Sequence, residues 1–404
     1  MRIGVNYTPR VGWFHSWLDL DLDAVKEDFQ AIAMLGMDHV RIFPLWPLLQ
    51  PNRGLIRPRA VADVISVVDA AAAAGLGVSV DALNGHLSSY DFLPSWVTTW
   101  HQQNLFTDPV ALDGEAALVS HLAAVLCGHP AVTGMTLGNE FAQFAGPSPM
   151  HRHPTLSVAT PDDIDVWFDR ILAPLEAGWP DGAHHHGFDD DLWFVDAHPF
   201  TPRHAVTRGA STTVHSWVFA QVGPRYGEGH PALTSFPRYL LEVARAWSPD
   251  PSRPLWLQEV GAPRTHVTDE SAADFVSATL DAVVDTPGLE AITWWCSHDV
   301  SRSLLDFPAL EYSLGLFTSE GVAKPEALLL AERMPELRAT GVPAAADPRD
   351  VPVLEFSADW QTGVGRSSTG PMGPLFDEWQ SRFNSGEVCS LRRVDKEMES
   401  VTTS

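Results

Sequence analysis

The chain has 404 residues, a formal net charge of −25, 45% hydrophobic residues and 19% charged residues. A chain of this length can form one large domain or two ordinary ones around a sizeable core. The negative charge argues against nucleic acids and anionic membranes as partners, since both need a positive face. The sequence shows no charged-then-apolar leader and no apolar run near the roughly 18 residues of a membrane span. With three cysteines that lack disulfide or metal spacing, it indicates a cytoplasmic, non-membrane protein.

Apolar segments and amphipathic segments alternate along the first 340 residues. The predicted strands cover residues 3–7, 39–43, 77–82, 132–137, 192–196, 212–217, 255–258 and 291–299. The predicted helices include residues 22–35, 59–74, 114–126, 162–175, 236–247, 272–284 and 324–333. Eight strands alternating with helices predict a (β/α)8 TIM barrel with loop insertions. A doubly wound sheet is the alternative, but no G-x-G-x-x-G or G-x-x-x-x-G-K-[ST] motif follows any strand.

The composition divides the chain in two. We expect a catalytic barrel over residues 1–340 and, over residues 341–404, an appended or partly disordered C-terminal extension that is not a second catalytic domain. A polar loop at residues 146–160 could wall off one end of a cleft. The run His184–His186 lies among glycine and aspartate, and we interpret it as a loop and not a metal site.

Two glutamates follow apolar segments of the same design. Residues 132–140 form a predicted buried strand that ends at Asn139 and Glu140. Residues 254–263 have the same pattern, in which an apolar strand ends at Glu259 and a Gly/Pro loop follows. Folding gives no reason for a carboxylate at either place, although a helix cap would be an ordinary explanation of one alone. Active sites of (β/α)8 barrels lie at the C-terminal ends of the strands. The sequence also places there Asn6, Tyr7, Arg41, His86, His198, His215, Trp217, Trp294 and Trp295.

Two carboxylates across a barrel mouth suit the hydrolysis of a glycoside. One glutamate gives its proton to the leaving oxygen, and the other attacks the anomeric carbon. Aromatic rings offer flat surfaces to the C–H faces of sugars, and asparagine and histidine can bind the 2-hydroxyl. Arg41 and the histidines could instead be ordinary buried side chains. Trp294 and Trp295 are adjacent, so strand alternation points only one of them inward.

These residues resemble glycoside hydrolase family 5, over roughly residues 1–335. The resemblance implies that Glu140 is the acid/base and Glu259 the nucleophile, and that Asn139, Arg41, His86, His215 and an eighth-strand tryptophan accompany them. One departure is on the sixth predicted strand, where the family usually has His-x-Tyr and this chain has His215-Ser-Trp217. The partner of Glu259 is therefore open between Tyr7 and His215.

Three stretches, at residues 4–9, 43–47 and 85–89, are most similar to bacterial cytoplasmic β-mannosidases of that family. The resemblance implies a retaining exo-β-mannosidase that acts on short oligosaccharides such as mannosyl-β-1,4-N-acetylglucosamine, without a cofactor or metal. A homo-oligomer is compatible with this interpretation. Alternatives are an endo-β-1,4-mannanase or endoglucanase, which would need an open cleft, and a non-catalytic carbohydrate-binding barrel, which would not need both glutamates. A metal-dependent barrel hydrolase would need paired ligands near the first strand, where Asn6 and Tyr7 do not supply them. Retention predicts carboxyl groups about 5–5.5 Å apart, against about 6.5–9.5 Å for inversion, and a higher pKa for Glu140 than for Glu259.

Overall fold

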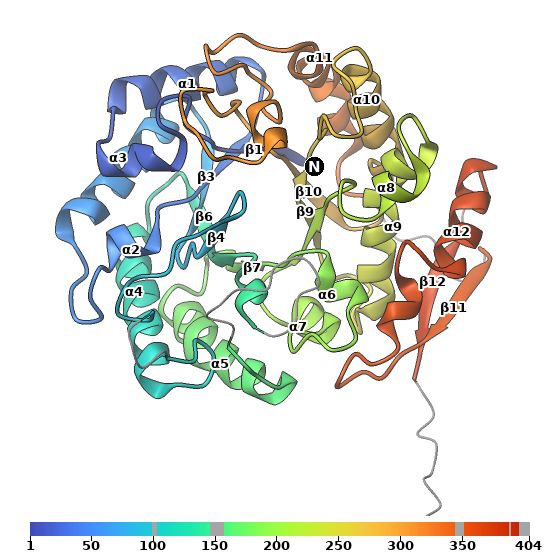
Figure 1. Cartoon of the computed structure of the whole chain (residues 1–404), viewed down its shortest axis with the longest axis horizontal. Coiled ribbons are helices and arrows are strands. Elements are labelled where there is room, and N and C mark those ends of the chain that lie inside the picture. Colours follow the sequence, from blue (N-terminus) through green and yellow to red (C-terminus); the bar gives the residue numbers. More distant parts are fainter. Residues whose placement is uncertain (99–102, 146–156, 344–350, 388, 396–404) are drawn as a thin grey trace, which may run out of the picture.

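Eight parallel strands form the centre of the molecule. The computed structural model describes residues 1–98, 103–145, 157–343, 351–387 and 389–395. Its main sheet has the order β7-β6-β3-β2-β1-β10-β9-β8, and helices surround it (Figure 1). The strands are β1 (Arg2–Asn6), β2 (His39–Ile42), β3 (Gly77–Asp81), β6 (Val132–Asn139), β7 (His185–Gly187), β8 (Thr212–Ser216), β9 (Leu255–Val260) and β10 (Leu289–Trp294). The predicted (β/α)8 barrel is confirmed.

The parallel register brings the ends of the strands to one rim. β1 pairs with β2 so that Asn6 lies beside Arg41, and β8 pairs with β9 so that His215 lies beside Glu259. β1 also pairs with β10, which joins the first strand of the chain to the last strand of the barrel. Polar side chains far apart in sequence therefore meet at the carboxyl edge, as expected for this fold.

The fifth strand is not where the sequence predicted it. Residues 192–196 were expected to be a strand, but α6 (Asp191–Phe194) is a single helical turn, and β7 is formed by His185–Gly187 instead. The prediction was wrong because β7 has no apolar residue and is buried through imidazole rings. His186 stacks on Phe200 with ring centroids 5.6 Å apart, and burial lowers its pKa to about 3, so it is neutral.

β7 and β8 form a seam in the barrel. Among the described residues, the two strands are the ends of the sheet order and are not paired by a ladder. Side chains and one loop amide join them instead: Thr213 Oγ1 donates to the His186 carbonyl at 2.5 Å, and the Ala210 amide donates to the His184 carbonyl at 2.8 Å. The wall next to the seam therefore depends on other parts of the chain for support.

The helices pack around the barrel and most of the longer ones begin with a proline, which fits the first turn because it needs no N–H there. They are α1 (Leu22–Met34), α2 (Trp46–Leu49), α3 (Pro58–Ala73), α4 (Pro109–Leu126), α5 (Pro161–Gly178), α7 (Pro202–Thr207), α8 (Val222–Tyr226), α9 (Pro231–Trp247), α10 (Ala272–Val283) and α11 (Pro325–Thr340). By length and composition α4 is long and apolar enough to cross a membrane, but 50% of that stretch is buried inside the protein, as in an ordinary core helix.

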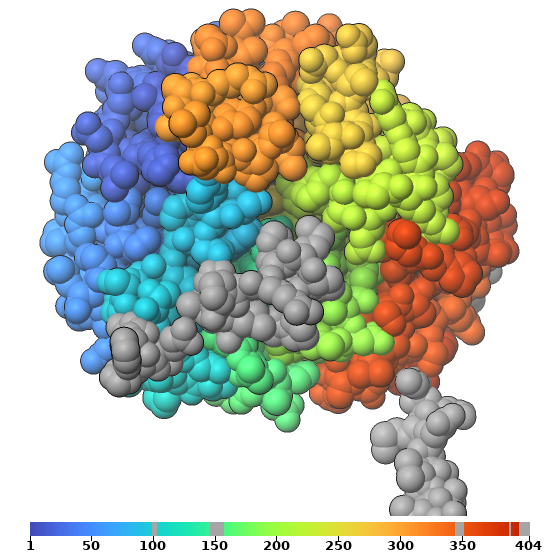
Figure 2. Space-filling model, viewed as in Figure 1, coloured from blue at the N-terminus to red at the C-terminus, as the bar shows by residue number. Residues whose placement is uncertain are grey.

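The connections after the strands build a second apolar cluster over one side of the barrel mouth. They include η1 (Trp13–Leu18), the hairpin of β4 (His86–Leu87) and β5 (Tyr90–Asp91), and the segment after β10 with η3 (Ala309–Tyr312). Phe14, Phe307 and Trp295 belong to this cluster. Figure 2 shows the segment after β10, in orange, over one side of the mouth. A short turn, η2 (Phe141–Phe144), follows β6 on the other side.

The C-terminal extension packs on the outside of the barrel. It contains the parallel pair β11 (Val353–Ser357) and β12 (Ser390–Val394), the turn η5 (Arg366–Thr369) and α12 (Pro374–Asn384). The red segment in Figure 1 lies beside α9. Trp379 is buried against Tyr239 of α9, with ring centroids 5.1 Å apart. The described part of the extension is therefore an ordered layer that shares its core with the barrel.

Candidate active site

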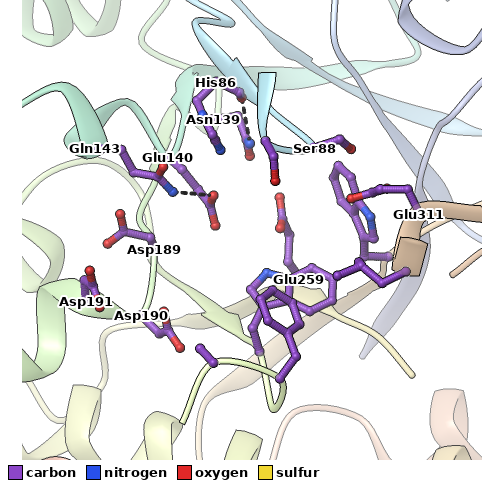
Figure 3. A pocket seen from close by; sticks show the side chains of 16 residues that line it. His86, Ser88, Asn139, Glu140, Gln143, Asp189, Asp190, Asp191, Glu259 and Glu311 are labelled. Atoms are coloured by element: carbon purple, nitrogen blue, oxygen red, sulfur yellow. Dashed lines mark hydrogen bonds between the residues drawn. The ribbon is translucent and has the colours of Figure 1, made fainter. Parts of the chain in front are cut away.

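Glu140 leaves the end of β6 in an unusual backbone conformation. Its φ of 45° and ψ of 32° lie in the left-handed region, which costs a residue other than glycine about 1–3 kcal/mol. The Glu140 amide donates to the Gly187 carbonyl at 3.0 Å, and Gln143 Nε2 donates to Glu140 Oε2 at 2.9 Å. These bonds hold the turn, and the carboxylate points into the pocket at the barrel mouth (Figure 3).

Glu259 lies at the end of β9 and is held by Arg41. Arg41 Nη1 donates to Glu259 Oε1 at 2.9 Å, and both residues are buried. Asp81, at the end of β3, accepts from Arg41 Nε at 2.9 Å and from Nη2 at 2.7 Å. Burial lowers the pKa of Arg41, but the carboxylates of Asp81 and Glu259 raise it by more, so the guanidinium is charged. Gly187 lies close against this group. A Cβ at this position would come within 3.0 Å of Arg41 Nη2, so the absence of a side chain leaves room for the guanidinium.

His215 connects the two glutamates. Its Nδ1 lies 2.8 Å from Glu140 Oε1 and 3.4 Å from Glu259 Oε2, and its Nε2 lies 3.0 Å from Gln258 Oε1. Burial lowers the pKa of His215, but the charges of Glu259 and Glu140 raise it by more, so the net shift is upward. Because Nε2 donates to Gln258 Oε1, the short contact to Glu140 holds one proton, either on the imidazole or on the carboxyl group.

The two carboxylates are close together. One oxygen of Glu140, one of Glu259 and one nitrogen of His215 all lie within 4.8 Å of one another. Burial raises the pKa of Glu259, and the charge of Glu140 adds to this effect, whereas His215 and Arg41 lower the pKa. The net shift of the Glu259 pKa is upward. Imidazole and carboxylate groups at this spacing are also possible metal ligands. Here the His215 ring already contacts both glutamates, and Arg41 donates to Glu259, which is the arrangement that positions an acid and a nucleophile.

The pocket above these groups is a cavity of about 170 Å³ that opens to solvent. Figure 3 shows side chains from several different connections converging on it. It is lined by His86, Ser88, Ser89, Asn139, Glu140, Gln143, Asp189, Asp190, Asp191, Trp217, Phe219, Ala220, Glu259, Trp295, Leu310 and Glu311. The rings of Trp217 and Trp295 meet at 79° with centroids 6.2 Å apart and form an apolar corner. Such a corner next to carboxylates suits a sugar, which has both apolar faces and hydroxyl edges.

The structure brings together most of the residues predicted for the site. Glu140, Glu259, Asn139, His86, Trp217 and Trp295 line the pocket. Arg41 and His215 lie directly beneath it, bonded to the glutamates. His215, and not Tyr7, is next to Glu259.

Three other predicted residues are not among the lining side chains of the described chain. Tyr7 donates to Asp28 at 2.9 Å and packs on Phe29. Trp294 belongs to the main core, so Trp295 is the member of the pair that faces the pocket. His198 Nδ1 accepts from the Phe200 amide at 3.1 Å behind the pocket wall.

Several pocket residues were not singled out in the sequence. Asp81 supports Arg41, while Gln143, Ser88, Glu311 and residues 189–191 line the pocket. Only Asp81 and Gln143 carried a usable signal, because Asp81 is the second-last residue of a predicted strand and Gln143 follows Glu140 by three positions. Of the loop expected to wall off the cleft, residues 146–156 lie outside the described part of the chain.

No protein-family model matches the chain, and neither does any curated protein. Several solved structures, however, match the chain closely. The chain is 48% identical to GH5_18 from Streptomyces cattleya, crystallised in complex with GlcNAc, with a TM-score of 0.92 over 97% of this chain and 93% of that one. It is 42% identical to a variant of GH5_18 from Bifidobacterium longum subsp. longum in complex with Manβ1-4GlcNAc, with a TM-score of 0.92 over 97% and 91% of the two chains.

A more distant structure shares the fold. An exo-beta-1,4-mannosidase from an Opitutaceae bacterium is 23% identical, with a TM-score of 0.77 over 97% of this chain and 69% of that one. At this identity the likeness supports the barrel architecture alone.

Proposed function

Because this chain belongs to the GH5_18 group of glycoside hydrolase family 5, and is therefore a glycoside hydrolase, we propose that it is a retaining exo-β-mannosidase. Its substrate is a terminal β-linked mannose on a short oligosaccharide, with mannosyl-β-1,4-N-acetylglucosamine as the first candidate. The observation that carries the proposal is the pair Glu140 and Glu259, bridged by His215 with one oxygen of each within 4.8 Å of the other.

The proposed reaction is a double displacement. Glu259 attacks the anomeric carbon while Glu140 gives its proton to the departing glycosidic oxygen, which leaves with the aglycone. Glu140, now a carboxylate, then removes a proton from water. The water oxygen attacks the same carbon and releases Glu259, so the configuration at that carbon is retained. A spacing within 4.8 Å between carboxylate oxygens supports this route, because an inverting enzyme keeps its carboxyl groups about 6.5–9.5 Å apart to hold the water.

The surrounding groups support these roles. Arg41 holds Glu259 in place at 2.9 Å and favours its charged form. The proton in the contact between His215 and Glu140 is available to the leaving oxygen. Asn139 accepts from Arg41 Nη2 through its Oδ1 at 2.7 Å and lines the pocket, where it can meet the 2-hydroxyl of the sugar. A cytoplasmic location, where only short imported sugars are available, is part of the same proposal.

The test is the hydrolysis of aryl β-mannoside, β-glucoside and β-galactoside by the wild type and by Glu259→Ala. We expect activity on the mannoside, a loss of at least about 10³-fold in the variant, and partial rescue by azide with formation of the α-mannosyl azide. Mannoside hydrolysis that survives Glu259→Ala would remove Glu259 from the mechanism. Activity that appears only on longer β-1,4-linked chains would favour the endo-acting alternative.

A further inference from the structure

The pocket contains buried polar atoms that have no partner within the described protein. Ser88 Oγ and Glu311 Oε2 are two of them, near enough to one another for the Ser88 hydroxyl to lower the pKa of Glu311, and Gln143 Oε1 is a third. All three residues line the pocket. A buried polar atom without a hydrogen bond is costly, and native proteins rarely keep one unless a ligand or water satisfies it. These atoms therefore indicate where the hydroxyl groups of a sugar bind.

The unpartnered atoms lie at opposite ends of the pocket. Figure 3 shows Gln143 and residues 189–191 on the side of Glu140, and Glu311 on the other side, beyond Glu259. The charge effects agree, since Glu140 raises the pKa of Asp189 and Asp190 in addition to their burial, whereas Glu259 contributes to the raised pKa of Glu311. The acid stands at the leaving oxygen and the nucleophile beneath the anomeric carbon. The terminal sugar therefore extends from Glu259 toward Glu311, and the aglycone lies toward residues 189–191.

Glu311 is built into the wall at the terminal-sugar end. It lies on η3 and is 5% exposed. Its amide donates to the Pro308 carbonyl at 3.0 Å, and its carbonyl accepts from the Val300 amide at 3.1 Å. Its neighbours on this connection, Phe307 and Leu310, are part of the apolar cluster over the mouth. The side chain thus has a fixed main chain beneath it and apolar groups around it.

The charge state of Glu311 suits a neutral partner. Burial raises its pKa to about 8, with the Ser88 hydroxyl opposing and Glu259 adding to the shift. At neutral pH the carboxyl group is protonated, so it offers one O–H donor and a carbonyl acceptor. A sugar hydroxyl needs both kinds of partner, and the hydroxyl of Ser88 on the same wall can supply the second contact.

We propose that Glu311, together with Ser88, binds the far edge of the terminal sugar, namely its hydroxyls on C3, C4 and C6, and thereby restricts the enzyme to chain ends. This inference rests on the proposed function. A sugar attached at C4 of the terminal mannose would have to pass through η3, so the same wall that recognises the edge excludes longer non-reducing chains.

The test combines protein variants with altered substrates. Aryl β-mannosides that lack the 2-, 3-, 4- or 6-hydroxyl are compared on wild type, Glu311→Ala and Ser88→Ala. We expect Glu311→Ala to lower kcat/KM on the complete mannoside roughly 10- to 100-fold. Removal of at least one far-edge hydroxyl from the substrate should lower kcat/KM of the wild type by a similar factor, and kcat/KM of Glu311→Ala by much less. Removal of the 2-hydroxyl, which lies near Asn139, should cost both proteins the same factor.

Controls separate this inference from the proposed function. Gln143→Ala changes the other end of the pocket. Removal of a far-edge hydroxyl from the substrate should therefore lower kcat/KM of this variant by the same factor as in the wild type. Glu311→Gln keeps the size and hydrogen bonding of the side chain and should retain most activity, and thermal unfolding confirms that each variant is folded. Losses for Glu311→Ala that are independent of all three far-edge hydroxyls would overturn the assignment of Glu311. A wild type without activity on any mannoside would overturn the proposed function instead.

Discussion

Arg41 shows how single residues organise this site. A guanidinium has five N–H donors, and Arg41 makes five hydrogen bonds: two to Asp81 and one each to Asn139, Glu259 and Asn6. A buried cation is tolerated only when its charge and donors are satisfied in this way. Since the acceptors sit on β1, β3, β6 and β9 or directly at their ends, one side chain fixes the relative positions of four strand ends around the nucleophile.

A buried acid that stays protonated makes stability depend on pH. Glu311 has a pKa of about 8 when folded, raised by burial and by Glu259 against the effect of Ser88, and an ordinary glutamate titrates near 4.5. Between these values the unfolded chain releases a proton that the folded chain keeps, so rising pH destabilises the wild type. Glu311→Gln has no such proton. We expect its melting temperature, relative to wild type, to rise steadily from pH 5 to pH 8.

Thermal unfolding at intervals across that range measures the effect. Glu355→Gln, on the exposed side of β11 and paired with Arg392, is the control for removing a surface carboxylate. A pH-independent difference between Glu311→Gln and wild type would mean that Glu311 is ionised in the folded protein at neutral pH.

At the scale of elements, the turn η5 supports the wall of the pocket beside the seam. Arg366 is fully buried. Its guanidinium donates to the carbonyls of Val195 at 2.7 Å, His198 at 2.7 Å and Phe200 at 3.2 Å. The residues that Arg366 contacts, within 195–200, follow shortly after residues 189–191, which line the pocket on the side of Glu140. The extension therefore replaces the support that a ladder between β7 and β8 would give.

Replacing Arg366 should affect the aglycone side of the pocket more than the terminal-sugar side. We expect Arg366→Met to lower the free energy of unfolding by about 2–4 kcal/mol, because it leaves buried carbonyls without donors. Below its melting temperature, kcat/KM should fall about tenfold more on mannosyl-β-1,4-N-acetylglucosamine than on an aryl mannoside, whose activated leaving group needs less positioning. Arg392→Ala, an exposed ion pair with Glu355, should change neither quantity by much. Equal losses on both substrates would assign Arg366 a purely structural role.

The same elements show how far the sequence could be interpreted. Strand ends carried the signal for Arg41, Asn139, Glu140, His215 and Glu259, because the period of the apolar segments places each one at the rim. β7 was missed because its burial uses neutral imidazoles, which a hydropathy pattern reads as polar. Glu311 and residues 189–191 were missed because they lie on connections, where tertiary packing and not local periodicity decides which side chain faces the pocket.

At the scale of the whole molecule, the extension and the barrel share one core. Trp379 of α12 is 1% exposed and packs on Tyr239 of α9 and on Phe376 and Phe383 of its own helix. Trp247, at the end of α9, packs on Phe356 of β11. A layer joined through so much buried aromatic surface should unfold together with the barrel.

Removing one of these rings tests that expectation. We expect Trp379→Ala to lower the stability of the whole protein by about 3–5 kcal/mol, since it leaves a cavity of aromatic size. In denaturant, loss of enzymatic activity and loss of helical circular dichroism should shift together and remain coincident. An early change in the helical signal with activity unchanged would show that the extension unfolds by itself.

The pairing of β1 with β10 has a consequence for the synthesis of the protein. Gly4 lies beside Thr293 in the folded barrel, so β1 keeps one unpaired edge until almost 290 further residues have been added. At about 5–20 residues per second, this takes roughly 15–60 s on the ribosome. During that time the nascent chain presents an open sheet edge, which is a template for association with other chains. Glu140 is translated long before Glu259 and Glu311, so an incomplete chain carries the acid without its nucleophile and cannot act on a sugar.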